Sequence, residues 1–318
     1  MPKPAAAVAI RPSGAVISIG ECMVELSRGT DGRFALAFGG DTFNTAAYMV
    51  RAGVAVAYAT AIGDDPYSRG IVAAARAEQV STDLFTILPG RMPGLYLIET
   101  TPEGERSFWY WRDRAAAREL FECANASTVA DAVASARLVY FSGITLSLYA
   151  PKGLDAFAQA LARARACGAT IAMDSNYRPR GWGGDIERAQ STFARFWALS
   201  HIALPTFDDE QALWNDATPN STADRLSALG VSEIIVKQGA EGALIRSAGH
   251  DTLVACPETV KPVDTTAAGD SFNAGYLARR LAGDAPADAA VLAHRLAGVV
   301  IQHRGAIVPK AATDVVLK

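Results

Sequence analysis

Residues 263–272 read Val-Asp-Thr-Thr-Ala-Ala-Gly-Asp-Ser-Phe and lead from a turn into a helical pattern that extends to about Ala282. Small residues at 267–269 let the backbone approach a ligand closely, and the first N–H groups of a helix have no partner within it. With the helix dipole they form an anion site suited to a transferring phosphoryl group. Asp270 would lie beside this site, either as a carboxylate that stabilises the helix N-terminus or as a general base. The spacing alone leaves both interpretations open.

Outside this stretch, short apolar runs alternate with helical patterns along most of the chain. This alternation predicts βαβ units around a mainly parallel sheet, and continuous apolar strands are typical of a sheet that helices cover on both faces. The predicted strands are 16–19, 54–60, 138–141, 170–173, 202–204 and 234–236. The predicted helices include 42–52, 67–78, 152–166 and 286–302. We expect one α/β domain over residues 13–318, preceded by a flexible N-terminus at 1–12.

Two stretches, 23–38 and 95–112, interrupt this α/β pattern. The second is predicted to be a hairpin, with turn residues at 101–104. Two-residue alternation places Arg106, Phe108, Tyr110 and Arg112 on one face, and Ser107, Trp109 and Trp111 on the other. Because both faces are aromatic, each should be covered. Either both pack against the parent protein, or the hairpin is a lid whose Tyr110 and Arg112 face a ligand while its tryptophans face a partner subunit or the lid's own layer.

The bulk properties exclude several classes of function. The chain has 318 residues, of which 50% are apolar and 20% charged, and a net charge of -3, which gives no reason to expect nucleic-acid binding. No apolar run is long enough to span a membrane, and the first residues do not resemble a secretory signal. The four cysteines lack zinc-ligand spacing. These features predict a cytoplasmic protein.

Residues 264–272 resemble the C-terminal signature of PfkB-type carbohydrate kinases, which usually has glycine at the position of Ala267. The N-terminal signature of the same family is matched by Gly39-Gly40-Asp41-Thr42-Phe43-Asn44-Thr45-Ala46, and Gly63-Asp64-Asp65 fits a further element. The resemblance implies a ribokinase-like three-layer α/β/α sandwich with a small β lid built from 23–38 and 95–112. It also implies that Gly39, Gly40 and Asn44 bind the sugar.

Several segments resemble the 2-keto-3-deoxygluconate kinase branch of that family. They are Gly20-Glu21-Cys22-Met23-Val24-Glu25-Leu26, Pro93-Gly94-Leu95-Tyr96, Tyr110-Trp111-Arg112, Asp174-Ser175-Asn176-Tyr177-Arg178-Pro179 and Arg304-Gly305-Ala306-Ile307. In this branch the residues matching Tyr96, Tyr110 and Arg112 contact the sugar acid from the lid, and Arg178 lies between substrate and phosphates. A keto acid needs a cation for its carboxylate, for which Arg112 and Arg178 are candidates.

The nucleotide side is marked by Lys237-Gln238-Gly239-Ala240-Glu241-Gly242, which resembles the family's loop along the ATP phosphates and ribose. The resemblance also assigns Asn176 and Arg178 to the phosphates and His294 to the neighbourhood of the adenine. Glu210 matches a glutamate that organises Mg²⁺ through water, although Phe207 stands where the family has asparagine. An acidic helix start would also explain that segment.

The resemblance therefore implies an ATP- and Mg²⁺-dependent kinase that phosphorylates 2-keto-3-deoxygluconate at its C6 hydroxyl. Asp270 would be the base, and the amides of Ala267, Ala268, Gly269 and Asp270 would form the anion hole. We also expect a homo-oligomer, with a dimer through the lid as one form. Two alternatives stay open: a kinase of the same family for a neutral sugar such as fructose or ribose, and a non-catalytic sensor of sugar acids or nucleotides.

Overall fold

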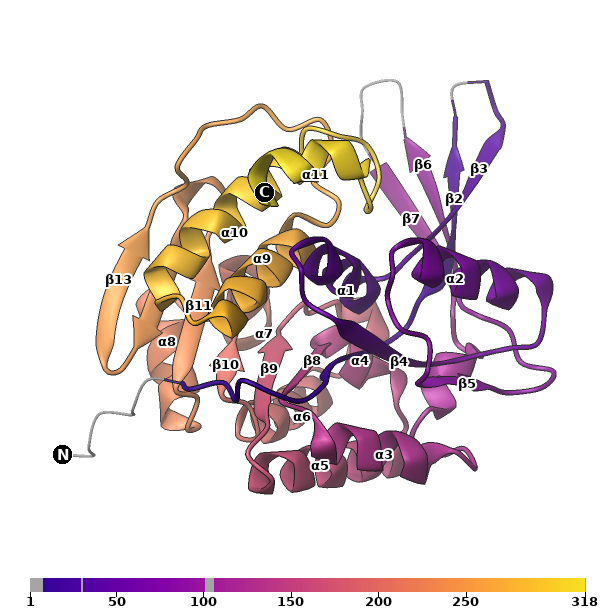
Figure 1. The fold of residues 1–318 in the computed structure, drawn as a ribbon, viewed down its shortest axis with the longest axis horizontal. Helices are drawn as coiled ribbons and strands as arrows, with labels where there is room; N and C mark the ends of the chain where they lie inside the picture. The colour runs from indigo at the N-terminus through magenta and orange to yellow at the C-terminus, as the bar shows by residue number, and fades with distance from the viewer. Residues whose placement is uncertain (1–7, 30, 101–105, 318) are drawn as a thin grey trace.

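The computed structural model describes residues 8–29, 31–100 and 106–317, and within these residues the chain forms two sheets. The larger sheet has nine strands in the order β13-β12-β11-β10-β9-β8-β1-β4-β5 (Figure 1). Its strands, in chain order, are β1 (Val16–Ile19), β4 (Val56–Ile62), β5 (Phe85–Ile87), β8 (Leu138–Ser142), β9 (Thr170–Asp174), β10 (Ile202–Ala203), β11 (Glu233–Lys237), β12 (Ala243–Ser247) and β13 (His250–Val254). All neighbours from β5 to β11 pair in parallel, whereas β11, β12 and β13 pair antiparallel.

The six predicted strands and four predicted helices are confirmed, with ends displaced by one or two residues in some cases. The helices are α1 (Asp41–Arg51), α2 (Pro66–Ala77), α3 (Ala126–Ser135), α4 (Gly143–Leu148), α5 (Pro151–Ala166), α6 (Ile186–Trp197), α7 (Phe207–Trp214), α8 (Pro219–Ala228), α9 (Ala268–Ala282), α10 (Pro286–Val300) and α11 (Lys310–Leu317). Short 3₁₀ turns are η1 (Ala116–Glu119), η2 (Pro179–Trp182) and η3 (Gly239–Glu241).

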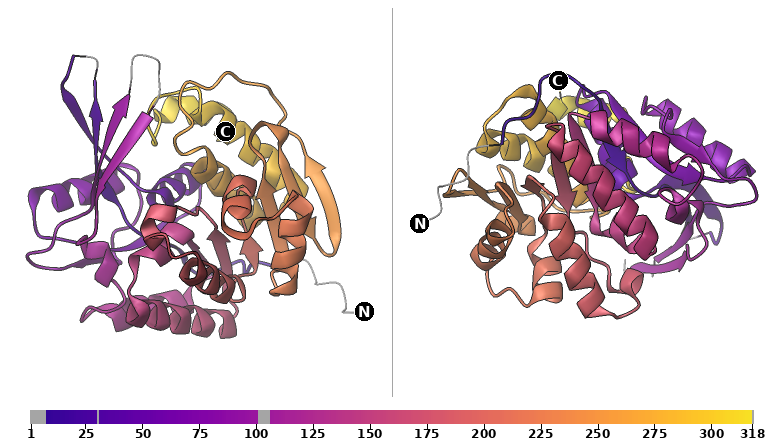
Figure 2. Two further views of the ribbon diagram at one scale, coloured as in Figure 1. Left: turned by 180° about the vertical axis from the view of Figure 1, so that it is seen from behind. Right: turned by 90° about the horizontal axis from the view of Figure 1, so that it is seen from below.

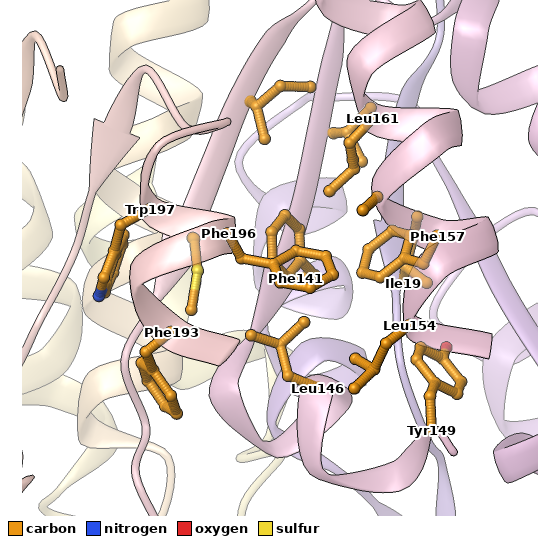
Figure 3. Packing of buried hydrophobic residues seen from close by; sticks show 14 of the residues in the cluster. Ile19, Phe141, Leu146, Tyr149, Leu154, Phe157, Leu161, Phe193, Phe196 and Trp197 are labelled. Carbon is orange, nitrogen blue, oxygen red and sulfur yellow. The ribbon is translucent and has the colours of Figure 1, made fainter. Parts of the chain in front are cut away.

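The helices cover the sheet on both faces, which gives the expected three layers (Figure 2). On one face α3, α5, α6 and α8 enclose an aromatic core in which Phe141 lies between Phe157 and Phe196, with ring centroids 5.0 and 5.9 Å away (Figure 3). On the other face α1, α2, α9 and α10 enclose a second core around Phe43, Tyr58 and Leu277. Two apolar faces explain why the strands are buried throughout their length.

The smaller sheet is the lid, and it stands away from the body of the domain next to α2 (Figures 1 and 2). Its order is β3-β2-β6-β7, and its strands are β2 (Met23–Arg28), β3 (Phe34–Gly39), β6 (Leu95–Thr100) and β7 (Arg106–Trp111). β2 pairs with β6 in parallel, and the two outer pairs are antiparallel. Both irregular stretches of the sequence thus contribute to one lid, as expected.

The register of the lid places Tyr110 opposite Tyr96 on the inner face and Trp109 opposite Leu97 on the outer face. This confirms the predicted alternation. Trp109 and Trp111 are 52% and 61% exposed, so the alternative in which both faces pack against the parent protein is wrong for the outer face. The predicted turn at 101–104 lies outside the described residues.

The expectation of a flexible N-terminus needs correction for residues 8–12. Val8 and Ile10 pack against the core, and the carbonyl of Val8 accepts a 2.9 Å hydrogen bond from Arg280 Nη2 in α9. The apolar side chains at 8 and 10 give this segment something to bury. Residues 1–7 lie outside the described residues. Within the described residues, no helix has the length and hydropathy needed to cross a bilayer.

Candidate active site

Two of the predicted site residues lie at the carboxyl ends of parallel strands: Asn176 follows β9, and Lys237 ends β11. Glu21, which was not among the predicted site residues, follows β1 at the same edge. This is the edge at which open α/β sheets commonly bind ligands, because the loops after neighbouring strands converge there.

Two helix N-termini meet at the centre of this edge. Asn44, in the first turn of α1, donates a 2.8 Å hydrogen bond from Nδ2 to Asp270 Oδ2 in the first turn of α9. Gly40 precedes α1, and a β-carbon there would lie 2.1 Å from the carbonyl oxygen of Glu21, so only glycine fits. The structure therefore brings together the two signatures that the sequence places far apart.

The first turn of α9 presents free backbone donors. Ala267 caps the helix with φ 59° and ψ 18°, a left-handed conformation that is unfavourable for a residue with a β-carbon. Among the described residues, the N–H groups of Ala267, Gly269 and Asp270 donate no hydrogen bond, whereas that of Ala268 bonds to Thr265 O at 3.2 Å. The amide of Ala268 is thus engaged within the turn, and the other three match the expected anion site.

Lys237 supplies a buried cation beside this turn. Its Nζ lies 3.2 Å from Asp174 Oδ1 and 3.0 Å from Asn273 Oδ1, and a β-carbon added at Gly269 would lie 3.5 Å from it. Asn273 Nδ2 in turn donates to Asp174 Oδ2 at 2.8 Å. This network fixes an ammonium group next to the place where the phosphates are expected.

Asp270 lies in a crowd of carboxylates. Burial and the negative charge of Asp41 raise the pKa of Asp270 to about 8, Asp174 adds to the effect, and the Asn44 hydrogen bond and Lys237 oppose it. Burial also raises the pKa of Asp41, whose Oδ2 accepts a 2.8 Å hydrogen bond from Asn176 Nδ2. A carboxyl with a pKa near neutrality is suited to general-base chemistry.

Asp41 and Asp174 were not among the predicted site residues, although both lie in quoted motifs. Asp41 follows the Gly39-Gly40 pair directly, and Asp174 opens the segment that contains Asn176. Their position next to strand ends was a usable signal. Their proximity to Asp270 depends on the packing of α9 against the sheet, which the sequence does not reveal.

The inner face of the lid carries Tyr96 and Tyr110, with ring centroids 6.0 Å apart. The hydroxyl of Tyr96 donates to Glu25 Oε2, and the β-carbon position of Gly39 points toward this hydroxyl. Tyr96 is 8% exposed and Tyr110 43% exposed. Tyr110 is thus partly open to solvent on this face, while Glu25, which was not predicted, holds Tyr96.

Both candidate arginines already contact acidic groups. Arg112 Nη2 lies 2.5 Å from Glu21 Oε2, and Arg178 Nη1 lies 3.1 Å from Asp209 Oδ1. A further arginine was missed: Arg180, in η2, donates from Nη1 to the carbonyl of Phe108 in β7 at 3.2 Å. This contact connects the body of the domain to the lid.

The nucleotide segment forms the tight turn that its glycines predict. Gly239 and Gly242 have φ values of 58° and 102°, which favour glycine. Cys256 Sγ lies 3.5 Å from the carbonyl of Gly239 and 3.4 Å from His294 Nδ1, so His294 is next to this turn. Burial lowers the pKa of His294, which keeps the ring neutral near physiological pH.

Glu210 is held away from the cleft. Its side chain has no exposed surface, Arg225 Nη2 lies 2.5 Å from its Oε2, and burial raises its pKa to about 7. Phe207, at the usual asparagine position, packs against the aromatic core. Within the described residues, no group of three acidic, histidine or cysteine side chains is arranged to hold a metal. An outer-shell role for Glu210 stays a prediction, and this geometry does not favour it.

Comparison with known proteins agrees with this geometry. Residues 14–313 match the profile described as pfkB family carbohydrate kinase. The chain belongs to this family. This pfkB-family chain is 42% identical over 303 residues to the 2-dehydro-3-deoxygluconokinase of Escherichia coli (strain K12), and the match covers 92% of this chain and 97% of that protein.

A second relative of this pfkB-family kinase is the 2-dehydro-3-deoxygluconokinase of Dickeya dadantii, also 42% identical over 303 residues, with 92% of this chain and 96% of that protein covered. Among solved structures, a putative Ribokinase II from E. coli in complex with ATP and Mg²⁺ matches with a TM-score of 0.81 and 22% identity, covering 96% of this chain and 99% of the other. The expected ribokinase-like fold is confirmed.

Proposed function

We propose that this pfkB-family kinase transfers the γ-phosphoryl group of ATP to the C6 hydroxyl of 2-keto-3-deoxygluconate. The observation that carries the proposal is the 42% identity, over nearly the whole chain, to kinases named for this substrate. Two arginines next to the lid, Arg112 and Arg178, support it because a sugar acid carries a carboxylate that neutral sugars lack.

The proposed mechanism uses Asp270 as the base. Asp270 takes the proton of the C6 hydroxyl, the oxygen attacks the γ-phosphorus, and the bond from that phosphorus to the β-phosphate bridging oxygen breaks. The free amides of Ala267, Gly269 and Asp270, with the ammonium group of Lys237, would stabilise the charge on the phosphoryl oxygens. The products are 2-keto-3-deoxy-6-phosphogluconate and ADP.

Mg²⁺ fits this site as an ion held chiefly by the nucleotide. Mg²⁺ often binds through phosphates, waters and one or two carboxylates rather than in an all-protein cage. Asp41 and Asp174 act electrostatically on Asp270, and Lys237 pairs with Asp174, which leaves an excess of negative charge that a bound cation would offset. Asp41 and Asp174 are the side chains that we propose to face the hydrated ion, which would supply positive charge opposite the phosphates.

ADP release measured across a panel of sugars tests the proposed activity. We expect kcat/KM for 2-keto-3-deoxygluconate to exceed that for fructose or ribose by at least about 100-fold, in line with loss of a charge-assisted carboxylate contact. Preference for a neutral ketose would instead support the first alternative. Binding of the sugar acid and ATP without phosphoryl transfer would support a sensor.

We also propose that two copies of the chain associate through the outer face of the lid, where four large apolar side chains are 50–61% exposed: Phe34, Leu36, Trp109 and Trp111. Exposed apolar patches of this kind often mark interfaces. Sedimentation of the wild type should give a dimer, and Trp109→Glu a monomer. A monomeric wild type would contradict this proposal.

Finally, we propose that the protein works in the cytoplasm, where ATP is available. The four cysteines Cys22, Cys123, Cys167 and Cys256 are free thiols, as is usual in a reducing compartment.

A further inference from the structure

Glu21 belongs to a motif to which the proposed mechanism gives no role, yet it lies where the lid joins the body of the domain. The chain enters the lid between β1 and β2 at Glu21, enters it again before β6 at Gly94, and leaves it after β7 at Arg112. The three crossings meet in one place, because Glu21 contacts Arg112 and Gly94 packs against both.

The contact between Glu21 and Arg112 is a buried ion pair. Their side chains are 2% and 19% exposed, and the shortest distance is 2.5 Å. The lid also has an exposed ion pair, Arg28–Glu99, with side chains 54% and 42% exposed at 3.2 Å. Exposed ion pairs contribute little to stability, whereas removing one partner of a buried pair leaves an uncompensated charge in the interior. The two pairs therefore provide a comparison between the base of the lid and its strands.

Gly94 shows how closely the pair is packed. A β-carbon at this position would lie 2.4 Å from Glu21 Oε1 and 3.1 Å from Arg112 Cβ. The φ of Gly94 is not in the left-handed region, so the glycine is needed for space. Any larger residue at 94 would displace the carboxylate or the arginine.

Arg112 keeps a donor available although it is paired. Among the described residues, the buried Nε of Arg112 has no hydrogen-bond partner, whereas Nη2 faces Glu21 Oε2 in the ion pair. Buried polar atoms without partners are uncommon and often belong to sites that a ligand completes. The guanidinium is thus held through Nη2 by the charge of Glu21 and keeps its Nε–H free for an oxyanion.

We propose that Glu21 is a positioning residue, which holds Arg112 at the base of the lid in the orientation that receives the carboxylate of the sugar acid. The inference rests on the proposed function, because it assumes an anionic sugar. A long arginine side chain loses much conformational freedom when it binds, and a fixed carboxylate removes that freedom beforehand. The negative charge of Glu21 also weakens the attraction of Arg112 for other anions, so geometry contributes to selection.

A double-mutant cycle tests this role. We expect Glu21→Gln to raise KM for 2-keto-3-deoxygluconate at least about 10-fold with a smaller change in kcat and no change in KM for ATP. Since Glu21 acts through Arg112, the variant carrying both Glu21→Gln and Arg112→Ala should be no worse than Arg112→Ala alone. The control Glu99→Gln, which removes the exposed pair, should match the wild type.

Gly94→Ala is a second variant that disturbs the pair without removing either charge. It should raise the same KM, and its effect should also vanish in the Arg112→Ala background. Thermal melting of each variant identifies a folding defect. If Glu21→Gln does not fold, the inference is tested by Gly94→Ala measured alone and in the Arg112→Ala background. If the variants fold and the effect of either substitution simply adds to that of Arg112→Ala, the inference is wrong. An equal rise in KM for the sugar acid and KM for ATP would also overturn it.

The wild-type sugar panel separates this inference from the proposed function. If the wild type prefers a neutral sugar, the proposed function fails, and the same cycle is measured with that sugar. Coupling between positions 21 and 112 would then still support a positioning role for Glu21. Independent effects at the two positions would overturn it, whichever sugar is used.

Discussion

The body of the domain and the base of the lid differ in how the charged groups of the candidate site are paired. At the proposed phosphoryl-transfer end, burial and the charges of Asp41 and Asp174 raise the pKa of Asp270 to about 8, while Lys237 pairs with Asp174. At the lid end each acidic group has its own partner, as in Glu21 with Arg112 and Glu25 with Tyr96. Under the proposed function, the first arrangement keeps the pKa of the base close to neutral pH, and the second fixes the groups proposed to contact the sugar.

The ends also differ in how firmly their residues are held. Asp270 and Lys237 are 9% and 7% exposed and are attached to α9 and the central sheet, whereas Tyr110 is 43% exposed on an edge strand of the lid. Chemistry that needs fixed geometry thus resides in the body of the domain. Under the proposed function, selection of the sugar would fall to the lid, which can vary without disturbing that geometry. Substitutions at the first end should change kcat, and substitutions at the second should change KM.

Asp270→Asn should give the largest effect. Loss of a general base is expected to lower kcat by about 100-fold or more, with both KM values little changed. Steady-state kinetics of ADP release measure this, with Asp288→Asn on the exposed side of α10 as the control. Near-normal turnover would show that Asp270 is not the base.

The same variant should be more stable than the wild type at pH 8. The folded-state pKa of Asp270 is above its usual value near 3.8, so between these values the folded protein holds the extra proton and loses stability as pH rises. Asparagine has no proton to lose in this range, so the variant does not lose stability in this way as pH rises. Thermal melting at pH 8 and pH 5 should therefore show a larger gain at pH 8.

Arg112→Ala tests the other end of the cleft. We expect KM for the sugar acid to rise about 10- to 100-fold, because a charge-assisted contact is lost, while KM for ATP changes little. Equal rises in both KM values would indicate a folding defect and would abolish the distinction between the two ends.

The crowding of carboxylates predicts a pH effect. Because Asp270 must be ionised to accept a proton, kcat/KM should fall as pH drops below about 8. Asp41→Asn removes a neighbouring negative charge, so the acidic limb of this profile should move to lower pH. An unchanged limb would show that the charge of Asp41 does not act on the base.

Ala267→Gly should give the smallest effect. Glycine relieves the left-handed conformation at φ 59° but adds freedom to the unfolded chain, for a net stabilisation of a few tenths to about 1 kcal/mol. Ala268→Gly, one residue into the helix, should instead destabilise by a comparable amount. Chemical denaturation compares the two, and a loss of stability in both would contradict the expected relief at 267.

Sequence patterns predicted the body of the fold because apolar strands, amphipathic helices and glycine turns are local signals. The positions of Asn44 and Asp270 followed from their signatures. The partners that set the chemistry did not: the pairing of Arg112 with Glu21, of Arg178 with Asp209 and of Glu210 with Arg225 depends on how distant segments pack. The hairpin of β12 and β13 was also missed, since a short antiparallel addition has no marker beyond its glycine turn.

The connectivity of the lid has a consequence for how the chain assembles. β2 pairs in parallel with β6, and the intervening chain contains α1, α2 and three strands, two of which belong to the main sheet. During synthesis β2 cannot pair with β6 until all of that segment has been made. Closing so long a loop is entropically costly, so the lid should form late and open first, with backbone amides that exchange with solvent sooner than those of the central strands.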